Sequence, residues 1–453
     1  MGGEWREYTF ATLIQAQALE IGDGYRAKNS ELGGDGPFFL RAGHVRDTHI
    51  DFDGADRFHR ELTGAVTSKM SCPGDVIVTT KGNSTGRTSF VSDNLPPFVY
   101  SPHLSYWRSL DAKVIVPGFL RYWSRSQHFQ AQLAGLAAST DMAPYLSLVD
   151  QKRLRVILPP VGEQRAIAHI LGTLDNKIEL NRRMNETLEA MARALFKSWL
   201  VDFDPVRAKA EGRDPGLPKE IADLFPDSFE DSELGEVPRG WQVKRVEDLA
   251  ERVGMGPFGS SIKVETFVAE GVPVISGQHL HGFMLEDRTY NFITIKHADR
   301  LKSAIVERGD VVFTHAGNIG QVAYIPDTSQ YERYVISLRQ FFMRCDRSQV
   351  SPSFMALYFR SPEGQHRLLA NASSSGVPSI ARPVTYLRSI PVTIPPKPVM
   401  DEFDKLVQPM LFQFRGRQNE SRALAALRDT LLPKLLSGEV RVKEAERVSE
   451  ASS

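Results

Sequence analysis

A long stretch of heptad spacing stands out along the chain. From Ile167 onward, apolar or small side chains recur at alternating steps of four and three residues. This spacing keeps one face of an α-helix apolar over many turns and is typical of a coiled coil. The predicted seam consists of Ile167, Leu171, Leu174, Ile178, Asn181, Asn185, Leu188, Ala192, Leu195 and Trp199.

A second stretch near the other end of the chain has similar spacing on both sides of a polar middle around Gln413 and Arg417. Both predicted helices are weak at their centres, since Asn181 and Asn185 occupy seam positions in the first. A buried amide without a partner costs stability, but a paired one can fix the register of two helices. The predicted contact residues of the second helix are Phe403, Leu406, Met410, Leu424, Leu427, Leu431 and Leu435.

The two helices have two possible arrangements. Four heptads alone are typical of a homodimeric coiled coil, but two helices of one chain can pair without the entropy loss of joining two molecules. We therefore favour an intramolecular pair. A globular region precedes each helix, so an antiparallel pair would place these regions at opposite ends. About 36 residues at 1.5 Å each give a rod of roughly 50 Å, comparable with the roughly 34 Å of one DNA turn.

The regions that precede the helices repeat each other. "CPGDVIVTTKGNSTGRTSFV" begins at Cys72 and "ERGDVVFTHAGNIGQVAYIP" begins at Glu307. In both, a Gly-Asp turn leads into a β-branched run and a Gly-Asn loop, at an offset of 235 residues. Because this period far exceeds the roughly 20–50 residues of a solenoid repeat, it indicates two duplicated modules. Other landmarks recur in the same order, namely Trp5 and Trp241, Leu13 and Leu249, and Pro159-Pro160 and Pro395-Pro396.

Each module is predicted to mix strands and short helices. Strand-like runs such as "LRVILPP" end at paired prolines, and segments such as "SPSFMALYFRSPEGQHRLL" have helical spacing. We predict an α+β fold with two duplicated mixed α/β domains separated by two long helices that form an antiparallel coiled coil. The predicted ranges are 1–160 for the first domain, 161–205 for the first helix, 206–240 for a connector, 241–397 for the second domain, 398–446 for the second helix and 447–453 for a flexible tail.

Composition narrows the class of protein. The 453 residues are 42% hydrophobic and 24% charged, enough for more than one core. We find no apolar run of 18 residues and no signal-peptide pattern at the start, so we expect a soluble cytoplasmic protein with no membrane partner. Cys72 and Cys345 are too few for a disulfide framework and lack the spacing of a zinc site.

Net charge is zero, but it is distributed unevenly. Basic residues outnumber acidic ones by 17 to 16 in 1–160 and by 18 to 14 in 241–397, whereas acidic residues outnumber basic ones by 11 to 5 in 201–240. The predicted domains are therefore neutral to mildly basic. This balance is compatible with nucleic-acid binding but does not establish it.

The chain resembles the specificity subunits of type I restriction-modification systems. The resemblance rests on "LPPVGEQRAIAHILGTLDNKIELNRRMNETLEAMARALFKSWLVDFDPV", the connector "LFPDSFEDSELGEVPRGW", the paired Gly-Asp loops and the terminal "LRDTLLPKLLSGEVRV". It covers nearly the whole chain in the order of that family.

The resemblance implies a function. Two target-recognition domains would each read half of a split double-stranded DNA sequence. The helices would set the gap and bind two modification methyltransferase subunits, with restriction or translocase subunits as possible further partners. S-adenosylmethionine, ATP and Mg²⁺ are expected in those partners, with no cofactor in this chain.

The loops in which the two modules differ are the candidate DNA-binding sites. The shared Gly-Asp and Gly-Asn pairs suit turns, whereas the side chains around them differ in types able to contact phosphates or base edges. For each residue the alternative is a solvated loop position. The candidates are Lys81, Asn83, Ser84, Thr85 and Arg87, with His44 and Arg46, in the first module, and Gln278, His279, His315, Asn318 and Gln321 in the second.

No catalytic motif is complete. "NLPPF" approaches an amino-methyltransferase motif, but Leu95 separates Asn94 from the prolines. "GNSTGRT" has Arg87 where a phosphate loop needs lysine, and "PDSFEDSELGEVPR" lacks the lysine of a nuclease site. We predict a non-catalytic recognition subunit without a metal site. The alternatives are a coiled-coil scaffold that binds protein rather than DNA, which the weak net basicity favours, and a self-contained enzyme, which the incomplete motifs disfavour.

Overall fold

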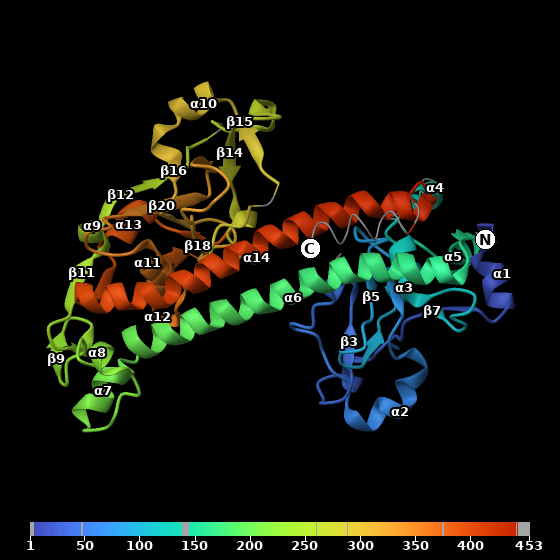
Figure 1. The fold of residues 1–453 in the computed structure, drawn as a ribbon, viewed down its shortest axis with the longest axis horizontal. Coiled ribbons are helices and arrows are strands. Elements are labelled where there is room, and N and C mark those ends of the chain that lie inside the picture. Colours follow the sequence, from blue (N-terminus) through green and yellow to red (C-terminus); the bar gives the residue numbers. More distant parts are fainter. Residues whose placement is uncertain are drawn as a thin grey trace. The chain divides into compact units, whose positions relative to one another are not determined.

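The computed structural model describes residues 4–46, 49–137, 145–259, 261–287, 289–373, 376–440 and 442. The chain divides into two compact units, which we call unit 1 (residues 1–181 and 419–453) and unit 2 (residues 182–418). The long helices α6 (Val161–Leu200) and α14 (Lys397–Ser437) each contribute one part to each unit (Figure 1).

Unit 1 is built on a four-stranded antiparallel sheet in the order β2-β7-β4-β5. Trp107 lies in its core, with ring centroids 5.1 Å from Phe10 and 5.3 Å from Phe129. The strands are β1 (Arg6–Thr9), β2 (Leu19–Asp23), β3 (Phe38–Leu40), β4 (Val76–Thr79), β5 (Thr88–Phe90), β6 (Phe98–Tyr100), β7 (Leu104–Ser109) and β8 (Arg155–Leu158). The short helices are α1 (Phe10–Gln15), α2 (Thr63–Val66), α3 (Pro117–Trp123), α4 (Gln127–Ala137) and α5 (Leu148–Arg153).

Unit 2 is built on a four-stranded antiparallel sheet in the order β12-β20-β17-β18 and a five-stranded sheet in the order β13-β15-β14-β19-β16. The strands are β11 (Gln242–Arg245), β12 (Ala250–Met255), β13 (Phe267–Val268), β14 (Val272–Ile275), β15 (Asn291–Ile293), β16 (Ile305–Glu307), β17 (Asp310–Thr314), β18 (Val322–Tyr324), β19 (Arg333–Ile336), β20 (Gln340–Cys345), β21 (Ala372–Ser373), β22 (Ser379–Ile380) and β23 (Pro391–Ile394). The short helices are α9 (Val246–Leu249), α10 (Ile295–Arg300), α11 (Pro352–Arg360), α12 (Pro362–Leu369) and α13 (Pro383–Ser389).

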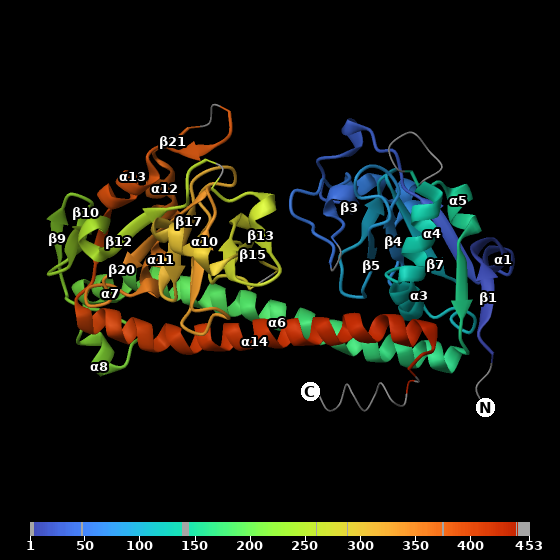
Figure 2. The same cartoon turned by 90° about the horizontal axis from the view of Figure 1, so that it is seen from above.

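The two units share one topology, which confirms the predicted duplication. The sheet β2-β7-β4-β5 corresponds to β12-β20-β17-β18, and the antiparallel pair β1-β8 corresponds to β11-β23. The parallel pair β3-β6 corresponds to the parallel pair β14-β19. Unit 2 extends this last pair with three more strands. Figure 2 shows β4, β5 and β7 on one side of the part of α6 that belongs to unit 1.

The long helices run antiparallel within each unit, as predicted. In unit 1, Asp175 pairs with Arg428 at 2.8 Å, and Asn181 donates a hydrogen bond to Glu420 at 2.7 Å, so rising numbers on α6 meet falling numbers on α14. In unit 2, Asn185 donates a hydrogen bond to the carbonyl oxygen of Phe414 at 3.3 Å. Each central asparagine therefore has a partner on the other helix, and these bonds specify the register.

The seam of α14 differs from the predicted one. Every predicted seam residue of α6 is buried or half-buried. On α14, Phe403 is buried, but Leu406 is 38% exposed and Met410 is only half-buried. Val407 and Leu411 are buried instead, because this half of α14 packs against both α6 and the core of unit 2 and turns a different face inward. The predicted contacts in the other half are described in unit 1, where Leu424 and Leu431 are buried and Leu427 is half-buried.

The connector has more structure than the sequence predicted. The first long helix ends at Leu200, before the predicted end at residue 205, and Phe203, with a left-handed φ of 57°, precedes the next helix. After it come α7 (Asp204–Ala210), α8 (Lys219–Ala222) and the hairpin of β9 (Phe229–Ser232) and β10 (Gly235–Pro238). Phe225 is 2% exposed and packs against Trp199, with ring centroids 5.2 Å apart. The connector is therefore part of the core of unit 2.

The second long helix ends at Ser437, before the predicted end at residue 446, and Gly438 follows with a φ of 73° that suits a helix terminus. The predicted tail, residues 447–453, lies outside the described residues.

Candidate nucleic-acid interface

An ion pair between a buried aspartate and a half-buried arginine supports the candidate loop in each unit. Asp75 accepts hydrogen bonds from Arg108 at 2.7 and 2.8 Å, and Asp310 accepts two from Arg344 at 2.8 Å each. These hydrogen bonds raise the pKa of both arginines, so they stay charged. Each aspartate also accepts a backbone hydrogen bond at 2.8 Å, Asp75 from Cys72 and Asp310 from Glu307. The repeated Gly-Asp motif thus fixes the start of a central strand to its neighbour.

The loops that follow these strands have one backbone design. Gly82 and Gly86 have φ of 86° in unit 1, and Gly317 and Gly320 have φ of 83° and 82° in unit 2. Such left-handed backbone favours glycine, which explains its recurrence. The second loop is one residue shorter. Arg87 and Gln321 therefore occupy equivalent positions, since their carbonyl oxygens accept corresponding backbone bonds from the last residues of β4 and β17.

The first loop presents only part of its predicted set to solvent. Lys81 and Asn83 are exposed, whereas Ser84, Thr85 and Arg87 are half-buried. The hydroxyl of Thr85 donates to the carbonyl oxygen of Gly82 at 2.7 Å and helps to close the loop. Arg87 donates to the carbonyl oxygen of Val45 at 3.2 Å. Lys81 and Asn83 are therefore the best placed of this set to contact DNA.

Two predicted histidines have an internal role instead. The Nδ1 atom of His44 accepts a hydrogen bond from the backbone of Arg41 at 2.9 Å, and that of His279 accepts one from Ser276 at 3.0 Å. His279 is 1% exposed, so it cannot meet a base edge in this structure, and its prediction is wrong. His44 is half-buried, and burial lowers its pKa. Both rings fix a turn that the units share.

Two further predicted residues are engaged elsewhere in their units. Arg46 forms an ion pair with Asp51 at 3.1 Å. The Nε2 atom of His315 lies 3.1 Å from the carbonyl oxygen of Leu338, and burial lowers the pKa of this ring. A neutral His315 donates that hydrogen bond and holds the loop between β19 and β20. We therefore assign His315 to support of this loop rather than to DNA contact.

The remaining predicted residues of unit 2 meet at one concavity of about 270 Å³. Gln278, Asn318 and Gln321 come together there from two loops that are distant in sequence. They are joined by His281 and Arg339, which sequence reasoning missed. Comparison of the modules beyond the Gly-Asn loop could have identified Arg339, because His103 occupies the corresponding position in unit 1 and differs from it. His281 carried no such signal.

Unit 1 has a basic cavity of about 290 Å³ beside its candidate loop, lined in part by Arg87, Arg125 and Arg428. Asp175 forms ion pairs with Arg125 at 3.3 Å and with Arg428 at 2.8 Å. Burial alone would raise the pKa of this carboxyl group, but Arg121, Arg125 and Arg428 together hold it below its ordinary value. Burial lowers the pKa of Arg125. Asp429 also lines the cavity and pairs with Arg428 at 2.7 Å, but four arginines outnumber the two carboxylates, so the cluster is net cationic and attracts an anion such as phosphate.

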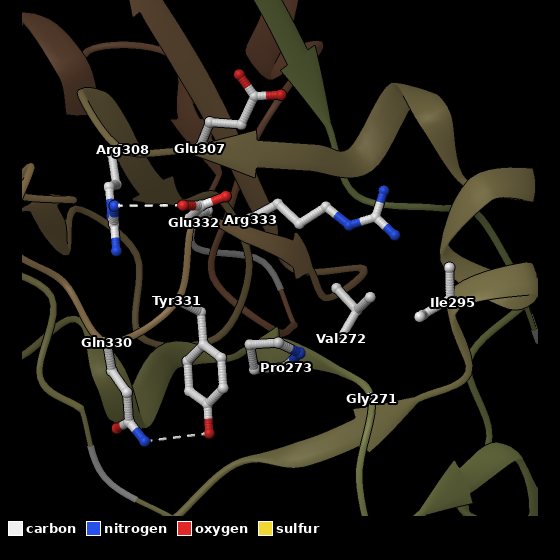
Figure 3. Close-up of a pocket in the computed structure, with 10 residues that line it drawn as sticks. All are labelled: Gly271, Val272, Pro273, Ile295, Glu307, Arg308, Gln330, Tyr331, Glu332 and Arg333. Atoms are coloured by element: carbon white, nitrogen blue, oxygen red, sulfur yellow. Dashed lines mark hydrogen bonds and ion pairs between the residues drawn. The ribbon is translucent and has the colours of Figure 1, made fainter.

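A further concavity of about 760 Å³ in unit 2 has a different character (Figure 3). Two carboxylates and two guanidiniums line it, and Arg308 lies 3.9 Å from Glu332. Glu307 and Arg333 add one charge of each sign. Because these charges cancel, this site does not favour a polyanion, and we do not assign DNA contact to it.

Metal and membrane sites were sought over the same part of the chain. Within the described ranges, no group of three or more His, Cys, Asp or Glu side chains is arranged to hold a metal ion. Among the helices described, none is both long and apolar enough to cross a lipid bilayer.

Comparisons with known proteins agree on one family. A model described as the type I restriction modification DNA specificity domain matches residues 54–190. The type I restriction enzyme HindI specificity subunit of Haemophilus influenzae is 26% identical over 410 residues, 81% of this chain and 86% of the relative. The MjaIX specificity subunit of Methanocaldococcus jannaschii is 26% identical over 351 residues, 73% of this chain and 70% of the relative.

Comparison with solved structures supports the fold. The crystal structure of a type I restriction-modification system S subunit from M. genitalium has a TM-score of 0.55 at 14% identity. That similarity covers 95% of this chain and 96% of the other.

Proposed function

We propose, from the premise that this chain belongs to the specificity subunits of type I restriction-modification systems, that its two units read the two halves of one split DNA sequence. The observation that carries this proposal is the duplicated scaffold with different side chains at equivalent loop positions. Lys81 corresponds to Ala316, Arg87 to Gln321 and His103 to Arg339. One scaffold with two sets of polar side chains suits two different half-sites.

Phosphate contacts supply most of the affinity in this proposal, and base contacts supply the choice of sequence. Lys81, Asn83 and the basic cavity of unit 1 are the phosphate-binding candidates. In unit 2 the base-reading candidates are the polar side chains of the 270 Å³ concavity.

The long helices are proposed to bind two modification methyltransferase subunits and to set the gap between the half-sites. Support comes from large apolar side chains that remain exposed on them. Leu180 on α6 is 50% exposed, Met191 on α6 is 49% exposed, and Phe412 on α14 is 72% exposed. Leu180 and Met191 are 11 residues, or about three turns, apart, so they share one face of α6, as side chains at a protein interface do.

Catalysis is assigned to the partners. The methyltransferase subunits are proposed to bind S-adenosylmethionine and to take the target base out of the helix, and a restriction subunit would use ATP and Mg²⁺. This chain then contributes recognition and assembly alone.

Co-expression with the modification subunits, followed by single-molecule methylome sequencing, tests the proposal. We expect adenine methylation at one bipartite sequence, which disappears when this chain is omitted. An intact complex with unmodified DNA would instead favour the protein-binding scaffold. Transfer of a labelled methyl group to DNA by the isolated chain would overturn the assignment of catalysis to partners.

A further inference from the structure

The concavity of unit 2 has a fixed polar floor. The buried side chain of Gln340 donates to the hydroxyl oxygen of Thr314 at 3.4 Å, and that hydroxyl donates to the Oε1 atom of Gln321 at 3.1 Å. Ser337 donates in turn to Gln340. Side chains joined in such a chain lose freedom to rotate, so Gln321 is held in one orientation.

That orientation determines which ring nitrogen of His281 carries the hydrogen. The Nε2 atom of Gln321 donates to the carbonyl oxygen of Gly277 at 3.1 Å, and a carbonyl oxygen can only accept, so the amide is not reversed. The same amide nitrogen lies 3.4 Å from Nδ1 of His281. Because an amide nitrogen cannot accept, Nδ1 must accept, and the neutral ring carries its hydrogen on Nε2. His281 is exposed and presents that N–H as a donor.

Arg339 supplies further donors at the same concavity. Its side chain is exposed, and among the described residues no carboxylate lies within ion-pair distance of its guanidinium. The backbone around it is held on one side, because the main-chain N–H of His315 donates to the carbonyl oxygen of Arg339 at 2.9 Å. A Cβ atom at Gly317 would come within 3.2 Å of the guanidinium, so glycine leaves the space that Arg339 occupies.

We propose that Arg339 and His281 read a guanine in the half-site that unit 2 recognises. This inference rests on the proposed function and names the base contacts of one unit. In the major groove, guanine presents two acceptors, O6 and N7, and the fork of an arginine donates to both. Arg339 makes this bidentate contact, and His281 donates from Nε2 to an acceptor of the same or the adjoining base pair.

A phosphate contact by Arg339 is the competing explanation, and lysine distinguishes the two. Lysine keeps the positive charge but lacks the planar fork, so it preserves a phosphate contact and loses bidentate base recognition. The variants are Arg339→Ala, Arg339→Lys and His281→Phe, each co-expressed with the modification subunits. Arg300→Ala is the matched control, since it removes an exposed arginine of the same unit that lines neither concavity of unit 2 described above.

Methylome sequencing gives the readout. We expect the wild-type motif to contain a G·C pair in one half. Arg339→Ala and Arg339→Lys should reduce the preference for guanine at that position by about 10- to 100-fold in methylated fraction, the range expected for one bidentate contact. His281→Phe should reduce preference at the same or the adjoining position by about 10-fold. The other half and the control should be unchanged.

Three outcomes would overturn the inference while leaving the proposed function intact. The first is a wild-type motif in which neither half-site contains a G·C pair. The second is an unchanged motif in both Arg339 variants. The third is that Arg339→Ala weakens methylation equally at all sites and that Arg339→Lys restores the wild-type level. A wild-type chain that directs no bipartite methylation would overturn both. Co-purification of each variant with the modification subunits shows that it has folded, and Arg339→Lys and His281→Phe keep the test valid should Arg339→Ala fail to assemble.

Discussion

Units 1 and 2 agree closely in the ion pair at the start of their central strands and differ in the side chains of the loops that follow. Asp75 with Arg108 and Asp310 with Arg344 form the same two-bond pair, with distances that agree within 0.1 Å. The loops a few residues later share their left-handed glycines but differ in side chains. A duplicated fold can therefore diverge in what it binds without losing stability, because backbone geometry and this ion pair carry the fold.

The units also differ in how they are joined to the long helices. In unit 2, Asp287 pairs with Arg415, which is 3% exposed, and the aspartate also accepts from Tyr290 at 2.7 Å. In unit 1, Asp175 on α6 pairs with Arg428 on α14 but also with Arg121 and Arg125 of the domain that precedes α6. The described pair in unit 2 joins α14 through Arg415, whereas Asp175 in unit 1 shares its charge among three arginines.

Lengthening both helices tests whether the two units act on one DNA site, and it has the largest expected effect. Insertion of four residues after Arg183 and after Arg417 extends each helix by about 6 Å. The tolerated gap between half-sites should change by one or two base pairs, with methylation at the original sites lost, as methylome sequencing would show. Insertion in α6 alone is the control, because it changes the spacing between Asn181 and Asn185 but not the spacing between their partners on α14. An unchanged gap would contradict the spacer role.

Removal of the ion pair that occurs in both units tests whether it stabilises each unit to the same extent. Asp75→Ala or Asp310→Ala removes the buried carboxylate that accepts two charged hydrogen bonds from a half-buried arginine, and each should cost about 3–5 kcal/mol of stability in its own unit. Calorimetry of the full chain should show that the unfolding temperature of the altered unit falls by about 10 °C in either variant. A large effect in one unit and none in the other would refute the shared role.

Removal of the α14 arginine that joins each unit to the long helices should destabilise unit 2 more than unit 1. Arg415→Ala removes the buried arginine of this pair, leaves the hydrogen bonds from Tyr290 and Gln330 to Asp287, and should cost about 3–5 kcal/mol. Arg428→Ala should cost about 1–2 kcal/mol, because Asp175 keeps its other arginines. Thermal unfolding of the two variants measures both, and equal losses would contradict the contrast.

The pH dependence of unit 2 sharpens this contrast. Burial would raise the pKa of Asp287, but hydrogen bonds from Arg415 and Tyr290 hold it below its ordinary 3.8. A lowered carboxyl pKa contributes stability that is present above about pH 4 and is lost as the pH falls through the folded-state value. In Arg415→Ala this loss should begin at higher pH, which thermal melts between pH 3 and 6 would detect. Identical profiles would contradict the role of Arg415.

The smallest expected effect concerns one surface charge. Lys81 and Ala316 occupy equivalent positions, since each forms a β-bridge to an equivalent residue, Tyr145 or Ser379. If Lys81 contacts phosphate, Lys81→Ala should lower the salt slope of DNA binding by about one. Ala316→Lys should raise it by about one, because it gives unit 2 the charge that unit 1 has. Titrations of the assembled complex at several salt concentrations measure both, and an unchanged slope in both would contradict the phosphate role.

The sequence by itself determined the duplication, the α+β class and the antiparallel helix pair, because repeats and heptad spacing can be recognised along the sequence without knowledge of tertiary contacts. Tertiary structure decided which face of α14 is buried. Leu406 and Val407 are both apolar, and Val407 is the buried one because α14 packs against both α6 and the core of unit 2. It also decided that His279 is internal while His281 and Arg339 share a concavity. Residues from distant loops come together only when the strands pair, and the spacing of residues along the sequence does not predict which of them will meet.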